Sequence, residues 1–112
     1  MSFADAGLDD FFRSSPALYH ALPEGVQITF EISGAGGGLW TVHRREGGGI
    51  EVSRTAARRP DCMLRCSVDD FIGLVEGQFH VRDAFMEGRL EVTGDVGLVW
   101  RLQKILVARK GA

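Results

Sequence analysis

Apolar and polar residues alternate most regularly between Val26 and Ile32, where every second side chain is hydrophobic. A period of two residues is typical of a β-strand with one buried face and one face in water. Shorter runs rich in β-favouring residues follow, and they predict further strands at residues 39–44, 50–53, 62–66 and 90–92. Glycines crowd the stretches 34–38 and 47–49, so we expect hairpin loops to join the first three of these strands.

A helical period precedes these strands. It predicts an acidic, amphipathic helix over residues 5–13. Its apolar positions are Leu8, Phe11 and Phe12. Ser15 is a good N-cap and is followed by a proline, which suits a first helical turn, so we expect a second short helix that ends near Pro23.

Helical patterns also follow the fourth strand. Ser67 stands three residues before an aspartate, which is close to a capping box and predicts a helix that ends at Gly77. Residues 81–85 predict another short helical segment. Asp95 is a good N-cap for a final helix over residues 95–108.

The final helix is apolar in two directions. One stripe consists of Leu98, Val99, Leu102, Ile105 and Leu106. A second group on nearly the opposite side consists of Val96, Trp100 and Val107. Because a helix that covers a sheet normally needs one apolar face, the second group calls for its own explanation. The alternatives are core that wraps round the helix, a dimer contact, a membrane-docking surface and the wall of a ligand cavity.

The length and charge of the chain limit the classes of function. A chain of 112 residues is expected to form a single domain, with a helical segment at 1–22 and the sheet with its covering helices at 23–112. The net charge of -2 argues against the strongly positive surface that nucleic-acid binding requires. No apolar run approaches the roughly 20 residues of a membrane span, and the acidic first residues lack a signal-peptide pattern. We therefore expect a cytoplasmic protein.

The residue types that carry chemistry are scattered. Cys62 and Cys66 stand four residues apart, which is neither a zinc nor a redox spacing, so buried apolar roles are favoured. His20, His43 and His80 show no metal-ligand spacing. The serines lie outside any G-x-S-x-G motif, and the glycine-rich loop lacks the lysine of a phosphate-binding loop. The sequence predicts no catalytic residue, no metal and no cofactor, and an enzyme built on His43 and carboxylates is the least favoured alternative.

A longer pattern covers the second half of the chain. Residues 67–77 read SVDDFIGLVEG, and residues 83–98 read DAFMEGRLEVTGDVGL. This pattern resembles the sterol carrier protein type 2 domain, in which a short capped helix, an Ala-Phe pair and a strand ending in Gly-Asp follow one another. The matching positions are Gly77, Ala84, Phe85, Gly88, Arg89, Gly94, Asp95, Leu98 and Leu102. The first half agrees more loosely at residues 30–32 and 38–40, so the resemblance covers residues 20–108.

The resemblance implies an α/β fold in which a mixed, largely antiparallel sheet of about five strands carries helices on one face and encloses a hydrophobic tunnel. It also implies that the protein binds a fatty acid, a fatty acyl-CoA or a sterol-like lipid there without catalysis. The expected ligand-binding residues are Phe71, Leu74, Val75, Phe79, Phe85, Leu98, Leu102, Gln103, Ile105 and Leu106. We expect Gln103, or an arginine at the mouth, to contact the head group and the final helix to act as a gate.

Two other functions fit the same apolar surfaces. One is an accessory module that presents a quinone or polyprenyl intermediate to a biosynthetic enzyme. The other is a structural domain that forms a homodimer through the group around Trp100. The expected partners are therefore a hydrophobic small molecule, a membrane in transient contact, and either a second copy or a biosynthetic enzyme.

Overall fold

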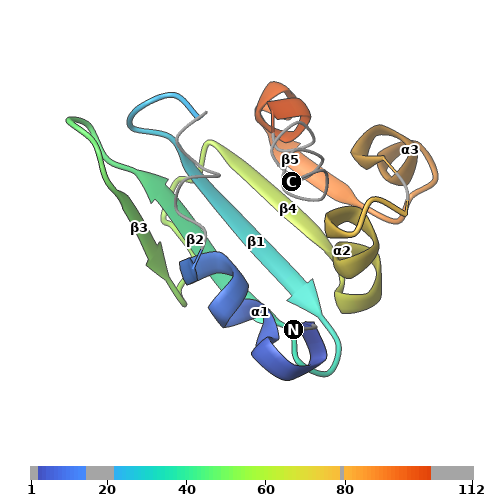
Figure 1. Ribbon diagram of the computed structural model, residues 1–112. Helices are drawn as coiled ribbons and strands as arrows, with labels where there is room; N and C mark the ends of the chain where they lie inside the picture. Colours follow the sequence, from blue (N-terminus) through green and yellow to red (C-terminus); the bar gives the residue numbers. More distant parts are fainter. Residues whose placement is uncertain (1–2, 15–21, 79, 102–112) are drawn as a thin grey trace.

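The protein is built around a five-stranded β-sheet. The computed structural model describes residues 3–14, 22–78 and 80–101. The strands are β1 (Gln27–Ser33), β2 (Gly38–Arg44), β3 (Ile50–Ser53), β4 (Cys62–Ser67) and β5 (Glu91–Gly94), in the spatial order β3-β2-β1-β4-β5 (Figure 1). Strands β1 and β4 run parallel, and the other neighbouring strands run antiparallel. The expected sheet, mixed and largely antiparallel, is confirmed.

The helices pack against one face of this sheet. They are α1 (Phe3–Ser14), α2 (Val68–Val75) and α3 (Val81–Met86), and residues 96–101 are also helical (Figure 1). Their buried side chains form one hydrophobic cluster with Ile28, Phe30 and Ile32 of β1, which share one face of that strand. The short helix expected between Ser15 and Pro23 falls mainly on residues outside those that the structure describes.

The helix starts follow the expected capping chemistry. The side chain of Ser67 accepts a hydrogen bond from the backbone N–H of Asp70 at 3.1 Å, which begins α2. The carboxylate of Asp95 accepts one from the N–H of Gly97 at 2.9 Å, where residues 96–101 turn into a helix. Both N-cap predictions are confirmed.

An aromatic cluster fills the space between α1, α2 and strands β1 and β2. Its members are Phe11, Phe12, Phe30, Trp40 and Phe71. Phe12 lies at the centre and is fully buried, with ring centroids 4.9 Å from Phe30, 5.0 Å from Trp40 and 5.6 Å from Phe71. Because aromatic pairs of this kind add about 0.5–1.5 kcal/mol each beyond burial, the cluster fastens α1 to the sheet.

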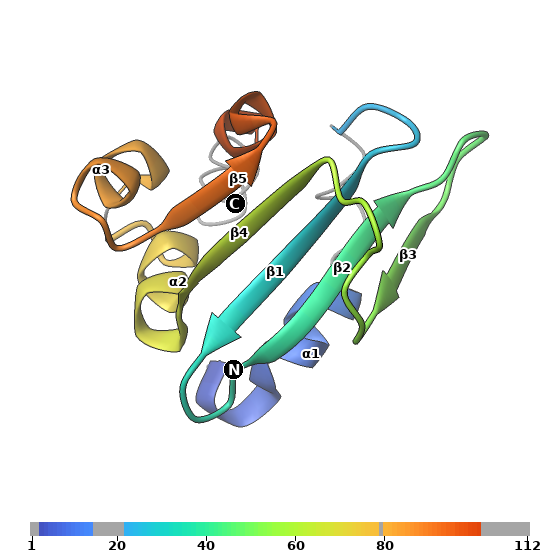
Figure 2. The ribbon, with the colours of Figure 1, turned by 180° about the vertical axis from the view of Figure 1, so that it is seen from behind.

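The opposite face of the sheet is covered in part by the chain between β3 and β4, residues 54–61 (Figure 2). Thr29 and Thr41 lie beneath this loop, and their hydroxyl oxygens are 2.9 Å apart. The N–H of Ala57 donates to Thr29 at 3.4 Å, and the hydroxyl of Thr41 donates to the carbonyl of Thr55 at 2.6 Å. The expectation that this face of β1 lies in water is therefore wrong at Thr29, which is 0% exposed because the loop covers it.

Candidate ligand-binding site

The predicted ligand-binding residues that the structure buries come from two helical segments. Phe71, Leu74 and Val75 project from α2, and each is at most 5% exposed. Leu98, in residues 96–101, is 4% exposed and belongs to the same hydrophobic cluster. The helical period placed these four side chains on inward faces, and the structure brings them together on one side of the sheet. Their contact with a ligand stays a prediction. Phe79, Leu102, Gln103, Ile105 and Leu106 lie outside the described residues.

Phe85 is placed differently from these residues. Helix α3 has six residues and turns Val81 and Ala84 into the core, so the next side chain, Phe85, points outward and is 37% exposed. It meets Trp100, which is 40% exposed, with ring centroids 6.2 Å apart. Phe85 thus lies apart from the buried residues of α2, and its contact with a ligand stays a prediction. Of the explanations for the second apolar group of the final helix, burial in the core does not apply to Trp100.

Strand β4 supplies an apolar surface that faces the helices. Its inward residues are Cys62, Leu64 and Cys66, each at most 8% exposed, and Val92 of β5 stands directly beside Leu64. Burial raises the pKa of the Cys62 thiol to about 11 and the pKa of the Cys66 thiol to about 12, with smaller contributions from nearby aspartates. Both thiols are therefore protonated at neutral pH, and this surface is apolar and not nucleophilic.

The two halves of the interior thus differ. On the β1 and β2 side, the rings of Phe12 and Trp40 fill the space under α1. On the β4 and β5 side, aliphatic side chains and thiols meet α2, α3 and residues 96–101. Phe71 belongs to both halves because it contacts the rings of Phe12 and Phe30 and projects from α2. The β4 and β5 side is therefore the part of the interior that aromatic rings do not fill.

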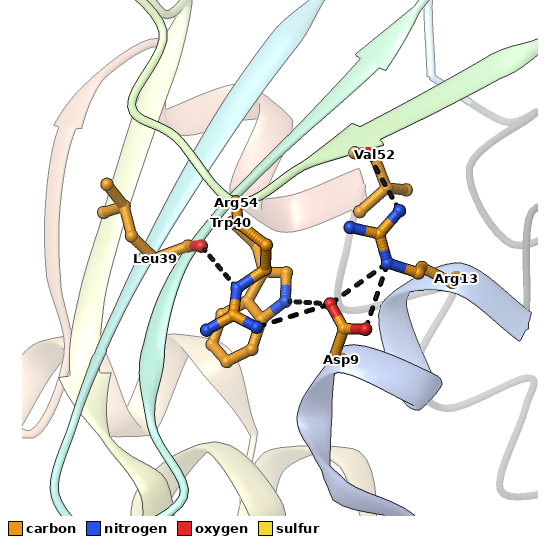
Figure 3. A network of polar contacts seen from close by, with 6 residues as sticks. All are labelled: Asp9, Arg13, Leu39, Trp40, Val52 and Arg54. Atoms are coloured by element: carbon orange, nitrogen blue, oxygen red, sulfur yellow. Dashed lines mark hydrogen bonds and ion pairs between the residues drawn. The ribbon is translucent and has the colours of Figure 1, made fainter.

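A polar network holds α1 at the edge of the aromatic half (Figure 3). The carboxylate of Asp9 accepts hydrogen bonds from Nε1 of Trp40 at 3.0 Å and from Nε of Arg13 at 3.1 Å. The Arg54 guanidinium lies 3.7 Å from Asp9 and 4.5 Å above the Trp40 ring. Arg13 also donates to the carbonyl of Val52 at 3.2 Å. The hydrogen bond from Trp40 is the main reason that the pKa of Asp9 lies below its ordinary value, and the two arginines lower it further. Sequence periodicity placed Asp9 on a solvated face and gave no sign of this network.

An open groove of about 790 Å³ lies at the carboxyl ends of β1 and β4. Its charged residues are Glu31, Arg65, Asp70, Arg89 and Glu91. Arg65 stands between Glu31 and Glu91 in the strand register; it pairs with Glu31 and lies 3.9 Å from Glu91. Arg89 lies 4.0 Å from Asp70 and 3.2 Å from Glu87. The charged side chains of the groove thus pair with one another, and the apolar residues Ile32, Leu39 and Cys66 line it beside them.

Other chemistry is sparse in the part of the chain that the structure describes. Nδ1 of His43 lies 3.8 Å from a carboxylate oxygen of Glu51, in a register pair of β2 and β3. His80 precedes α3 and makes no side-chain cap hydrogen bond, while His20 lies outside the described residues. Among the described side chains, no three His, Cys, Asp or Glu residues come together as metal ligands would. The described helices are all too short or too polar to cross a membrane.

Comparison with known proteins places the fold. The Mus musculus protein named Hydroxysteroid dehydrogenase-like protein 2 is 28% identical over 102 residues, which cover 91% of this chain and 19% of that protein. This chain thus spans about a fifth of the length of that curated relative. The crystal structure of Sterol Carrier Protein 2 Like 2 from Aedes aegypti has a TM-score of 0.67 at 19% identity, covering 90% of this chain and 97% of that one. The structure of UbiJ-SCP2, a ubiquinone synthesis protein, has a TM-score of 0.64 at 19% identity, covering 86% of this chain and 80% of that one.

The family follows from the match over the chain itself. The model of the SCP-2 sterol transfer family matches residues 12–107, which include every strand, helices α2 and α3, and the last turn of α1. The aromatic Phe12, where the match begins, is the centre of the cluster that joins α1 to the sheet. The chain therefore belongs to the SCP-2 sterol transfer family.

Proposed function

We propose that the protein binds a hydrophobic ligand without covalent chemistry, between the β4 and β5 side of the sheet and the helical segments α2, α3 and 96–101. The observation that carries the proposal is the apolar surface of Phe71, Leu74 and Leu98 opposite the inward side chains of β4. Protonated thiols and aliphatic groups suit a ligand recognised by its apolar area. Membership of the SCP-2 sterol transfer family supports the same reading.

Burial of apolar surface can supply the free energy of binding, and no chemical reaction is needed. A ligand that removes about 300 Å² of apolar surface from water gains roughly 7.5 kcal/mol at about 25 cal/mol per Å². The loss of translational and rotational freedom opposes this gain, so a single small apolar ligand binds with modest affinity and a longer one binds more tightly. The ligand class that we favour is a fatty acid, a fatty acyl-CoA or a sterol-like lipid, whose long apolar part supplies the necessary area.

The test begins with the purified protein. Native mass spectrometry reports whether a ligand accompanies the chain, and extraction into organic solvent followed by mass analysis identifies it. Delipidated protein is then titrated with a fluorescent fatty acid. A stoichiometric lipid and saturable uptake are expected, whereas a mass equal to the bare chain together with no uptake of fatty acid, acyl-CoA or sterol contradicts the proposal.

Substitution of a residue in the proposed ligand-binding site makes the test more specific. Leu98 is 4% exposed and belongs to the proposed ligand-binding residues, whereas Leu39 is half-buried and lines the groove at the carboxyl ends of β1 and β4. Leu98→Trp adds a ring to the ligand space and is expected to weaken fatty-acid binding at least about tenfold, whereas the matched variant Leu39→Trp is expected to leave binding unchanged. Circular dichroism is used to test whether both variants fold. If a folded Leu98→Trp protein binds the fatty acid as tightly as the wild type, Leu98 does not contact the ligand.

In a second candidate function, the ligand binds at the same place but is passed to an enzyme. The protein would then present a quinone or polyprenyl intermediate to a biosynthetic enzyme, as the name of the structurally similar ubiquinone synthesis protein suggests. The extraction experiment separates the two candidates, because an isoprenoid ligand favours presentation and an acyl or sterol ligand favours carriage. A cytoplasmic location is part of both candidates.

A further inference from the structure

Three large apolar side chains lie at the surface on α3 and on residues 96–101. Phe85 is 37% exposed, Met86 is 76% exposed and Trp100 is 40% exposed, and we call these three residues the Trp100 patch. The rings of Phe85 and Trp100 meet edge to face at 6.2 Å and 86°, so the two helical segments present one continuous apolar surface. Clustered exposed apolar groups of this kind mark interaction sites more often than isolated ones do.

The patch is held on a fixed backbone. Phe85 directly follows Ala84, which is 1% exposed, and Trp100 directly follows Val99, which is 0% exposed. Ala84 and Val99 both belong to the hydrophobic core cluster. The inward residue of each pair therefore anchors its helix, and the outward residue is carried to the surface by the turn of that helix.

The charged side chain between the two α3 residues of the patch is basic. Arg82 precedes Phe85 by three residues and Met86 by four, so its side chain projects between them on the exposed face of α3. By the same helical projection, the acidic residues Asp83 and Glu87 fall beyond Met86, away from Phe85. Within the described part of the chain, Arg82 forms no salt bridge. Arg101 directly follows Trp100 and is exposed.

The sequence extends this bias. Residues 96–112 contain Arg101, Lys104, Arg109 and Lys110 and no acidic residue, although the whole chain carries 15 acidic and 13 basic residues. A symmetric contact of the patch with a second copy would bring Arg82 towards its counterpart, which is electrostatically unfavourable. An anionic surface complements these basic residues.

We propose that the Trp100 patch docks onto a membrane surface that carries anionic lipid head groups. Trp100 and Phe85 suit the boundary between head groups and acyl chains, and Met86 is flexible enough to fill gaps between lipids. Arg82 lies between Phe85 and Met86, where it meets the head groups, and attraction to an anionic leaflet adds to the burial of apolar area. Docking at this patch is independent of what occupies the ligand space, so the inference goes beyond the proposed function.

The test is sedimentation with sucrose-loaded vesicles. Vesicles of phosphatidylcholine alone are compared with vesicles of equal parts phosphatidylcholine and phosphatidylglycerol, at low and at high sodium chloride. The wild type is expected to sediment with the anionic vesicles and to be released by salt. Arg82→Gln is expected to lower the partition coefficient about fivefold, the factor that corresponds to about 1 kcal/mol per basic residue near such a surface. Met86→Ser, at the most exposed position of the patch, is expected to lower it severalfold.

Matched controls separate docking from misfolding and from ligand binding. Arg58→Gln removes an exposed positive charge from the loop on the opposite face of the sheet and is expected to sediment like the wild type. All variants are expected to keep the thermal midpoint and the fatty-acid uptake of the wild type, because the changed side chains are exposed. A fluorescence blue shift on vesicle addition that Trp100→Phe abolishes would place the indole at the membrane.

Three results would overturn the proposal. The first is that the protein does not sediment with anionic vesicles at low salt. The second is that the wild type, Arg82→Gln and Met86→Ser bind the vesicles equally. The third is a concentration-dependent dimer that Met86→Ser dissociates, while neither the wild type nor any variant binds vesicles. Loss of fatty-acid uptake with retained vesicle binding would instead count against the proposed function alone.

Discussion

The carboxylate of Asp9 accepts a hydrogen bond from Nε1 of Trp40 at 3.0 Å, although the two residues are 31 positions apart in the sequence. Phe12, three residues after Asp9, stacks on the same indole with centroids 5.0 Å apart and an interplanar angle of 28°. One turn of α1 thus contacts both the ring face and the indole N–H of Trp40 in β2. Trp40 is 1% exposed, so its N–H needs this acceptor.

The ionisation of Asp9 is expected to make the stability of the protein depend on pH. The pKa of Asp9 in the folded protein lies below its ordinary value of 3.8, chiefly because of the hydrogen bond from Trp40. A depressed pKa of a carboxyl stabilises the fold fully above the ordinary value, and this stabilisation is lost as pH falls below 3.8 through the folded pKa. Urea unfolding of the wild type is therefore expected to lose more stability below about pH 4 than unfolding of Asp9→Asn does.

The neighbouring residue provides the control for this prediction. Asp10 is exposed on the same helix, and Asp10→Asn is expected to keep the acid sensitivity of the wild type. If Asp9→Asn and the wild type lose stability in parallel on acidification, the ionised carboxylate of Asp9 does not hold α1 against Trp40.

Removal of the Phe12 ring is expected to detach α1 from the sheet. Phe12 is 0% exposed and its ring lies within 5.6 Å of Phe30, Trp40 and Phe71, measured between centroids. Phe12→Ala is therefore expected to lower the free energy of unfolding by about 3–5 kcal/mol. Phe85→Ala removes the same ring from a surface position and is expected to cost less than about 1 kcal/mol. Denaturant titration measures both, and equal losses would contradict the central place of Phe12.

Residue periodicity predicted the strands and the helix starts because each depends on neighbouring residues. The alternation of Ile28, Phe30 and Ile32 is a local consequence of which face of β1 is buried, and the caps at Ser67 and Asp95 lie within three residues of the N–H groups they accept from. The parallel pairing of β1 with β4 has no such local signal. The mixed sheet was predicted from the family resemblance and not from the period of hydrophobic residues.

Two of the features that periodicity missed depend on contacts between distant segments, and the third depends on the length of a helix. Thr29 looks like a solvated position until residues 54–61 cross it, and Asp9 looks like a surface charge until Trp40 reaches it. Phe85 fits a helical apolar stripe, but a six-residue helix has room to bury only Val81 and Ala84. Positions at which a helix is short or a loop folds back over a sheet are therefore where an amphipathic pattern predicts burial least well.

The two threonines under the crossing loop are expected to act as a unit. Because the hydroxyl of Thr41 donates to the carbonyl of Thr55, the hydroxyl of Thr29 is left to donate to Thr41 while it accepts from Ala57. Thr41→Val breaks this chain of hydrogen bonds at its buried middle and is expected to cost about 1–3 kcal/mol of unfolding free energy. Since Thr29→Val breaks the same chain, the double variant is expected to lose less than the sum of the single losses.

A double-mutant cycle with urea unfolding measures this coupling. Thr93→Val, at an exposed position of β5, is the matched control and is expected to change stability by less than about 0.5 kcal/mol. Additive losses for Thr29→Val and Thr41→Val would mean that the two hydroxyls stabilise the loop separately.

The thiols of the apolar surface are expected to resist chemical labelling as long as the protein is folded. Burial raises the pKa of Cys66 to about 12 and the pKa of Cys62 to about 11, and Cys66 is 8% exposed against 0% for Cys62. At about pH 8, the thiolate is then on the order of one molecule in ten thousand for Cys66 and one in a thousand for Cys62. A disulfide reagent is therefore expected to label both only after unfolding, while Thr93→Cys, an exposed cysteine on β5, is labelled at once. If Cys66 in the folded, delipidated protein reacts about as fast as Thr93→Cys, the β4 side of the interior is open to water and the apolar surface described for it is wrong.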